Sequence, residues 1–268
     1  MTSSGTTKPE ILLSFDVEEF DAPLEWGAPI TPAHQIGISE DGLTKLLGLL
    51  SRRGIPATLF TTGHFANERP ELIRSASEQH EIASHGLFHS TFDKSHLAES
   101  KALLENITGK KVAGFRRARL QPTPASWISE AGYLYNSSEN PTWIPGRYNN
   151  LHRPRTWFYE EGLMQIPTSV TRWRFPLFWM TFKHLPAPLL RRMLLQTMWH
   201  DRCLCLYFHP WEFSDFSHYR PPFLMGRVMG DRMLEILSRT FDWLQPEAEF
   251  LTFSEFVLRR QNAPVSPA

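Results

Sequence analysis

The 268-residue chain has two cysteines, no excess charge of either sign and no long apolar run. Its 28 basic and 28 acidic residues give a formal net charge of +0, so we expect no nucleic acid partner. No run of about 18 apolar residues is present, which argues against a transmembrane helix. The first ten residues are polar and lack the apolar segment of a signal peptide, which predicts a cytoplasmic protein.

The two cysteines and the absence of one motif argue against a disulfide framework and against a serine nucleophile. Cys203 and Cys205 stand two positions apart in an apolar run that ends at Phe208. On a strand they share a face and are too close in sequence for a comfortable disulfide, so we interpret both as free core thiols. A chain without a disulfide framework fits a reducing compartment. No Gly-x-Ser-x-Gly motif occurs, which argues against a covalent serine hydrolase.

Strand-like and helix-like segments alternate along the chain with short connections. Strands are predicted at residues 11–15, 56–61, 81–84, 112–116, 133–135, 163–167, 203–208 and 249–253. Helices are predicted at 40–53, 70–79, 94–107, 124–131 and 227–244, with a short one after Ser254. This alternation favours a parallel sheet with helices outside, as a barrel or a doubly wound sheet. We expect one domain at 10–260 between flexible tails at 1–9 and 261–268.

The segment from about residue 140 to 200 departs from this alternation and is rich in aromatic residues, which make up 13% of the chain. A bulky aromatic core or a surface that stacks on sugars or lipids would both produce this composition. Residues 173–195 fit either an insertion over the barrel mouth or an interfacial surface. In the second case a set of aromatic side chains would dip into lipid: Trp173, Phe175, Phe178, Trp179 and Phe182. Basic side chains would then face the headgroups: Arg174, Lys183, Arg191 and Arg192.

Acidic and imidazole side chains follow the predicted strands. The first strand runs into Asp16, Glu18 and Glu19, and the third runs into His85 and His89. One helical turn after Ser84 would place the two histidines on one side, suited to one metal ion. On a continued strand Asp16 and Glu18 share a face while Glu19 points away, so Glu18 is the favoured acidic ligand and Glu19 a competitor.

The ordered set Asp-x-Glu, His-x3-His, Gly-Phe-Arg at 114–116 and a buried strand ending in His209 resembles the polysaccharide deacetylases. This carbohydrate esterase family includes chitin and peptidoglycan deacetylases, and the resemblance covers about residues 11 to 257. It implies a distorted (β/α)7 TIM-like barrel and a divalent metal, with zinc as the first expectation from acid and imidazole ligands. The sequence at 208–212, Phe-His-Pro-Trp-Glu, is similar to a subgroup linked to exopolysaccharide or glycan loci.

The resemblance also assigns roles to individual residues. It makes Asp16 the base, His209 the acid that protonates the leaving amine, and Arg116 the group that orients Asp16. The implied metal ligands are Glu18, His85 and His89. The implied substrate contacts are Trp143, Tyr148 and Trp211.

The expected activity is removal of an N-acetyl group from an amino sugar in a polysaccharide, a glycan or a lipid-linked sugar. A cyclic-amide hydrolase of the allantoinase type on the same barrel is one alternative. A catalytically impaired glycan-binding homologue is another, because Asn136 stands where an aspartate that anchors the catalytic histidine is common, and Ala118 stands where proline is common. Peripheral membrane contact through residues 173–195 is expected if the substrate is lipid-linked.

Overall fold

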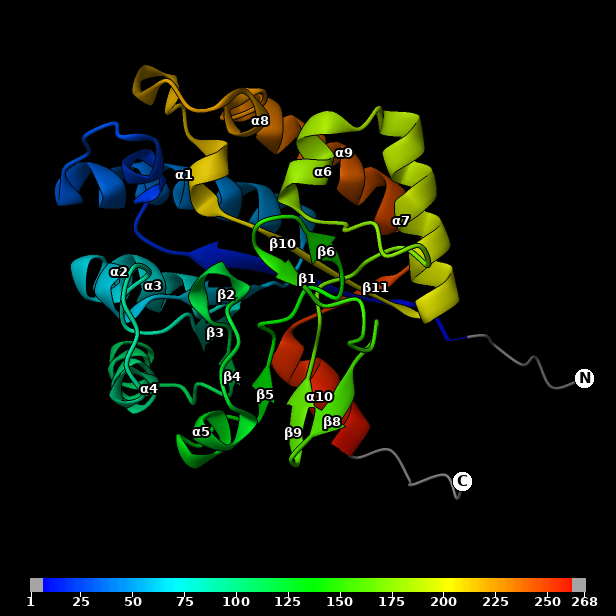
Figure 1. Ribbon diagram of the computed structural model, residues 1–268, viewed down its shortest axis with the longest axis horizontal. Helices are drawn as coiled ribbons and strands as arrows, with labels where there is room; N and C mark the ends of the chain where they lie inside the picture. Colours follow the sequence, from blue (N-terminus) through cyan, green and yellow to red (C-terminus); the bar gives the residue numbers. More distant parts are fainter. Residues whose placement is uncertain (1–6, 262–268) are drawn as a thin grey trace, which may run out of the picture.

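The computed structural model describes residues 7–261, and Figure 1 shows a central sheet surrounded by helices. Most of the two tails predicted to be flexible, residues 1–6 and 262–268, lies outside the described part. Pro9, at the end of the predicted N-terminal tail, is buried, and its carbonyl accepts a hydrogen bond from the amide of Glu249. Pro9 therefore packs with the sheet, one residue before the predicted boundary at residue 10.

The sheet has nine strands, and its parallel part follows the chain. It runs through β1 (Glu10–Val17), β2 (Thr58–Thr61), β3 (Glu81–Ser84), β4 (Gly114–Phe115), β5 (Tyr135–Asn136) and β9 (Leu163–Gln165). β10 (Cys203–Phe208) and β11 (Glu249–Leu251) both pair parallel with β1, and β8 (Phe158–Glu160) pairs antiparallel with β9. β1 is central because it contacts β10 along most of its length, β11 at its start and β2 at its end.

The barrel closes through a seam rather than a strand ladder. The amide of Ser169 donates to the carbonyl of Cys205 at 2.9 Å, and the amide of Cys205 donates to Ser169 Oγ at 2.8 Å. These contacts join β10 to the segment after β9, at the one place where the described strands form no continuous pairing. The predicted distorted barrel is therefore confirmed, and the seam is its distortion. Both cysteines are free thiols, as expected.

Helices cover the outside of the sheet, joined by short connections (Figure 1). They are α1 (Pro32–Arg53), α2 (Gly63–Glu68), α3 (Pro70–Ala76), α4 (Ser95–Thr108), α5 (Ala125–Glu130), α6 (Trp179–His184), α7 (Ala187–Asp201), α8 (Phe223–Gly226), α9 (Asp231–Leu244) and α10 (Phe253–Gln261). α1 starts eight residues before the predicted helix because Thr31 caps it by accepting from His34 N and Pro32 fits its first turn. α2 was not predicted, since six residues carry too little periodicity.

Helix α1 comes very close to the chain that follows β10 at Gly42. A Cβ on Gly42 would lie 1.8 Å from the carbonyl oxygen of Pro210, so only glycine allows this approach. Pro210 opens the short 3-10 helix η3 (Pro210–Phe213), which follows β10. The contact matters for the site because it fixes the chain next to His209.

The aromatic segment after residue 170 packs over the barrel. In α6, Trp179 and Phe182 are 8% and 2% exposed, and Lys183 is also buried. Their predicted contact with lipid and headgroups is therefore wrong for these three residues. Trp173 and Phe175 at its start are 92% and 45% exposed, and Leu189, Arg191 and Arg192 in α7 are also exposed. No helix of residues 7–261 is long and apolar enough to cross a membrane.

A small hairpin lies in the predicted loop after residue 140. It consists of β6 (Trp143–Ile144) and β7 (Tyr148–Asn149), with Gly146 in the turn at a φ of +78°. Thr142 Oγ1 donates to the carbonyl of Arg174, which ties the hairpin to the segment leading into α6. The insertion is thus a connected layer and not a series of independent loops.

Candidate active site

Five of the predicted site residues meet at the carboxyl end of the parallel strands. Asp16 is the second-to-last residue of β1, and Glu18 follows that strand directly. His85 follows β3, Arg116 follows β4 and His209 follows β10. Parallel strands end on one side of a barrel, so residues far apart in sequence come together there.

A carboxylate and two imidazoles form a candidate metal site. Glu18 Oε2 lies 3.1 Å from His85 Nε2 and 3.2 Å from His89 Nε2. One donor atom from each of the three residues lies within 4.8 Å of the others. The two histidines lie on a loop and not on the predicted helical turn, because Gly86 takes a φ of +86°. The predicted convergence is correct, although the backbone that produces it is different.

Neighbouring side chains hold these donors in place. Asp21 Oδ1 lies 2.9 Å from His89 Nδ1, which leaves Nε2 free to face Glu18. Trp211 Nε1 donates to Glu18 Oε1 at 3.2 Å. Glu19, the competing ligand, instead accepts from Thr62 Oγ1 and from the backbone amide of His89, both at 2.8 Å. Glu19 therefore supports the loop, and Glu18 is the carboxylate that faces both imidazoles.

The electrostatics of Glu18 and His89 favour positive charge at this site. Burial by itself would raise the pKa of Glu18, but His89, His85 and His209 together hold it well below its usual range. Burial would lower the pKa of His89, yet Glu18 and Asp21 raise it to about 9. The site therefore stabilises positive charge next to an ionised carboxylate, which is the field that a divalent ion would experience.

The spacing of the donors also fits a divalent metal. Ligand distances of about 2.0–2.1 Å in a tetrahedral zinc site put neighbouring donors roughly 3.3 Å apart. The two contacts of Glu18 Oε2 are close to that value. The contact of His89 Nδ1 with Asp21 matches the carboxylate–histidine arrangement that fixes metal-binding imidazoles. Glu18, His85 and His89 are therefore suited to hold a metal, and three protein ligands leave positions for water and substrate.

Asp16 is clamped by a fully buried arginine. Arg116 Nη1 donates to Asp16 Oδ1 at 2.6 Å and to Ser14 Oγ at 2.9 Å. Its Nε and Nη2 donate to the carbonyl and hydroxyl of Ser137, and its guanidinium lies 4.0 Å from the ring of Phe60. The predicted orientation of Asp16 by Arg116 is matched by this geometry, which leaves Asp16 Oδ2 free.

The free oxygen of Asp16 faces two imidazoles. Oδ2 lies 4.0 Å from His85 Nε2 and 4.0 Å from His209 Nε2. Asp16 therefore stands between the candidate metal site and His209.

His209 has an acidic partner that the sequence reasoning missed. Its Nδ1 lies 3.0 Å from Oε1 of Glu212, which also accepts from the backbone amide of His209 at 2.8 Å. Burial would lower the pKa of His209, but Glu212, Glu18 and Asp16 raise it. The family resemblance places such a partner at position 136, where this chain has Asn136. Asn136 instead donates to Gln165 Oε1 at 2.7 Å and accepts from Ser138.

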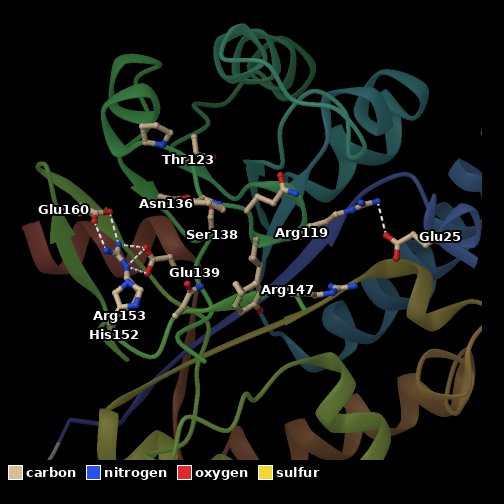
Figure 2. Close-up of a pocket in the computed structure, with 16 residues that line it drawn as sticks. Glu25, Arg119, Thr123, Asn136, Ser138, Glu139, Arg147, His152, Arg153 and Glu160 are labelled. Atoms are coloured by element: carbon tan, nitrogen blue, oxygen red, sulfur yellow. Dashed lines mark hydrogen bonds and ion pairs between the residues drawn. The ribbon is translucent and has the colours of Figure 1, made fainter. Parts of the chain in front are cut away.

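A large cavity of about 940 Å³ adjoins the site (Figure 2). Its walls include Asn136, Ser138 and Arg119, and Arg119 also borders a smaller cavity beside His85 and His89. The acidic side chains around it are neutralised. Figure 2 shows Arg153 between Glu139 and Glu160, with hydrogen bonds of 2.9–3.0 Å to both carboxylates. Across the cavity, Arg119 pairs with Glu25 at 3.1 Å.

The three predicted substrate contacts fall in different places. Tyr148 lines the cavity, where its hydroxyl accepts from Asn140 Nδ2. Trp143 is 59% exposed on the neighbouring strand of the hairpin and is not part of the cavity wall. Trp211 is 3% exposed and stacks on His209 with ring centroids 4.8 Å apart. Direct contact of Trp211 with a substrate does not fit this burial, so we interpret it as a support for Glu18 and His209.

Two supporting residues could have been found from sequence and one could not. Asp21 belongs to the acidic cluster after the first strand, and Glu212 follows His209 by three positions, so proximity alone pointed to both. Nothing in the sequence indicated that Lys183 supports the site. It stands 26 positions before His209 in an aromatic segment, yet its Nζ lies 3.6 Å from Glu212 Oε2.

Comparison with protein families supports the resemblance in the first half of the chain. Residues 4–127 match the family model described as polysaccharide deacetylase. This part includes Asp16, Glu18, His85, His89 and Arg116, and the family resemblance is confirmed there. A chitooligosaccharide deacetylase of Sinorhizobium fredii is 34% identical over 87 residues, which are 32% of each of the two proteins. The chain therefore matches about a third of that curated relative.

Solved structures extend the likeness of fold to the whole chain. A proposed polysaccharide deacetylase from Mycobacterium smegmatis superimposes with a TM-score of 0.65 at 19% identity, covering 99% of this chain and 97% of that one. One from Pseudomonas aeruginosa PAO1 gives 0.66 at 18% identity, covering 96% and 92%. The Puue allantoinase gives 0.70 at 16% identity, covering 98% and 94%. At these identities the matches establish the fold and not the activity.

Proposed function

We propose that this protein is a divalent-metal-dependent hydrolase that removes an acetyl group from the nitrogen of an amino sugar. The observation that carries this proposal is the position of Asp16, whose Oδ2 lies 4.0 Å from His85 Nε2 and from His209 Nε2. A base therefore stands between a candidate metal site and a candidate acid. The family match over residues 4–127 supports the same reaction class.

The side chains divide the reaction into two proton transfers. A metal held by Glu18, His85 and His89 would supply Lewis-acid activation of water and of the amide carbonyl. Asp16 Oδ2 accepts the proton of the attacking water, while Arg116 keeps the other carboxylate oxygen occupied. His209 Nε2 donates a proton to the departing nitrogen. Water and amide thereby become acetate and a free amine.

The cavity supports a substrate larger than one sugar ring. Its volume of about 940 Å³ lies near the upper end of the range for ligand pockets. Tyr148 offers an aromatic face in its wall, and Trp143 and Trp173 lie exposed close by on segments joined through Thr142 and Arg174. We infer an oligosaccharide or a lipid-linked sugar as the substrate class, zinc as the metal and the cytoplasm as the location.

The test is release of acetate by full-length protein loaded with zinc. N-acetylglucosamine oligomers, lipid-linked N-acetyl sugars and nucleotide sugars are assayed beside cyclic ureides, which the allantoinase-like fold makes the natural comparison. We expect acetate from an acetylated sugar and loss of that activity in Asp16→Asn. Turnover of ureides alone would favour the cyclic-amide hydrolase. Glycan binding without any turnover would favour the impaired, glycan-binding homologue.

A further inference from the structure

A buried ionic pair lies directly behind His209. Glu212 is 0% exposed and Lys183 is 3% exposed, and Lys183 Nζ lies 3.6 Å from Glu212 Oε2. Lys183 also donates to the carbonyl of Met225 at 3.1 Å and lies 4.9 Å from the ring of Trp179. The two charges come from elements far apart in sequence, η3 after β10 and α6 of the aromatic insertion.

A buried ion pair of this kind contributes little to the net free energy of folding. The cost of removing two charges from water is about as large as their attraction, and apolar residues of similar volume often serve equally well. The burial lowers the pKa of Lys183, although Glu212 opposes that shift. The position of the pair next to His209 therefore calls for a role besides stability.

The geometry fixes which nitrogen of His209 holds the proton. A carboxylate that faces a lysine can only accept hydrogen bonds, so His209 Nδ1 is the donor to Glu212 Oε1 at 3.0 Å. Nε2 then faces Asp16. The backbone of Glu212 is fixed too, because its amide donates to the carbonyl of His209 and its carbonyl accepts from Gly230.

We propose that Glu212, held by Lys183, is the positioning residue that orients His209 as the acid of the reaction. Glu212 in η3 and Lys183 in α6 thereby take the anchoring role that the family resemblance gives to an aspartate at position 136. The inference deepens the proposed function and rests on it, since it gives His209 a direction only if His209 acts on substrate. Glu212 and Lys183 touch no reacting atom and act through the imidazole.

Three carboxylates surround His209. They determine the direction in which the pH profile of turnover should move when one of them is removed. Glu212 faces Nδ1, Asp16 faces Nε2 and Glu18 acts from further away, while Arg116 lies behind Asp16 and Lys183 behind Glu212. Glu212→Gln removes one of the charges that favour imidazolium. Because His209 must be protonated to donate, the alkaline limb of kcat/KM should move to lower pH in this variant.

The experiment uses four forms of the full-length, zinc-loaded protein: wild type, Glu212→Gln, Lys183→Met and the double variant. On N-acetylglucosamine oligomers we expect kcat of Glu212→Gln to fall about 100-fold with little change in KM. Lys183→Met should lose roughly tenfold and also melt at a lower temperature, because it leaves Glu212 buried without its partner. The double variant should recover the melting temperature and not the activity.

Two further variants serve as controls. Glu212→Asp keeps the charge and should retain more activity than Glu212→Gln. Glu81→Gln removes a half-buried carboxylate at the start of β3, which is bonded to Thr58 at the start of β2 and to Ser254 in α10 (Phe253–Gln261), at the opposite end of the strands from His209. It should leave kcat and the pH profile unchanged. Recovery of activity together with stability in the double variant would overturn the proposal, since Glu212 would then be only structural.

A second readout does not depend on turnover. With ¹⁵N-labelled histidine, the zinc-loaded wild type above its titration midpoint should show neutral His209 with its proton on Nδ1, assigned by the resonance missing in His209→Asn. Glu212→Gln should lower the titration midpoint of that resonance by about one unit. An unchanged midpoint and tautomer overturn the positioning role. If the wild type releases no acetate but these shifts occur, the proposed function fails while the orientation of His209 by Glu212 stands.

Discussion

The two sides of the site are built in different ways. On the proposed metal side, Glu18, His85 and His89 come from the loops after β1 and β3, and their supports lie mostly on the same loops, with Trp211 of η3 as the exception. On the acid side, His209 is held by Glu212 from its own 3-10 helix and by Lys183 from the distant α6. The metal side is thus assembled locally, and the acid side depends on the packing of an insertion.

Because of this difference, we expect substitutions on the two sides to have different effects. Changes on the metal side should affect metal content first, because the donors and their supports are few and close together. Changes on the acid side should affect turnover and stability together, because a buried lysine, aromatic rings and a helix contact all meet there. The expectations below test this division, from the largest effect to the smallest.

The largest effect is expected from His89→Gln. It removes one of the imidazoles at 3.2 Å from Glu18 Oε2, which leaves two ligands for the ion. Bound zinc, measured by elemental analysis after dialysis, should fall to near zero and turnover with it. His200→Gln changes an exposed histidine at the end of α7 and should alter neither. Full zinc occupancy in His89→Gln would contradict the assigned ligand set.

Asp16→Asn should separate the base from the ligands. The substitution leaves Glu18, His85 and His89 in place, so metal content should stay, while turnover falls by about 10²–10⁴-fold. Asp21→Asn gives the opposite result as the matched comparison. It weakens the support of His89 Nδ1 and should reduce zinc affinity about 10–100-fold, with a smaller loss of turnover at saturating zinc.

Gly42→Ala should damage mainly the acid side. The new Cβ would meet the carbonyl of Pro210, so η3 must shift, with a stability cost of about 1–3 kcal/mol. Turnover should fall, and zinc affinity should change much less, because Trp211 of η3 donates only to Glu18 Oε1 and both imidazoles face Oε2. Gly48→Ala, on the same helix, meets only the flexible end of Arg52 and should be neutral or stabilising by about 0.5–1 kcal/mol. Denaturant titration and acetate release together check this pair.

Asn136→Asp tests the interpretation drawn from the sequence. A carboxylate at position 136 would face Gln165 and Ser138, so it would not reach His209. We expect no gain in turnover and a loss of stability of about 1 kcal/mol, measured by thermal unfolding. A clear gain in turnover would show that His209 lacks an adequate partner in Glu212.

The smallest effect on turnover is expected from a pH-dependent loss of stability away from the site. Burial lowers the pKa of His80 from 6.5 to about 4, and its Nδ1 has no hydrogen-bond partner among the described residues. The unfolded chain binds a proton before the folded one, so this part of the stability is present above pH 6.5 and is lost as the pH falls toward 4. Between pH 7 and 5 the loss should be about 2 kcal/mol, and His80→Gln should reduce it.

The residues that meet on the metal side could be predicted from the sequence, and those on the acid side only in part. Glu18, His85 and His89 follow strands whose apolar runs are short and clear, so their meeting at one edge follows from the fold class. The extra turns of α1 depended on Thr31 as a cap within a proline-rich stretch, which periodicity does not detect. Lys183 could not have been found, since its partner is defined by how the insertion folds back over β10.

The strand pairing of β1 has a consequence for how the chain folds. Ser14 Oγ donates to the carbonyl of Leu206, 192 positions later, and Glu10 pairs with Glu249 in β11. During synthesis β1 therefore leaves the ribosome long before β10 and β11 exist, and its apolar edge must wait for them. Loop closure over such distances slows folding and exposes unpaired strand edges. We expect late, cooperative folding and a need for chaperones during production of the protein.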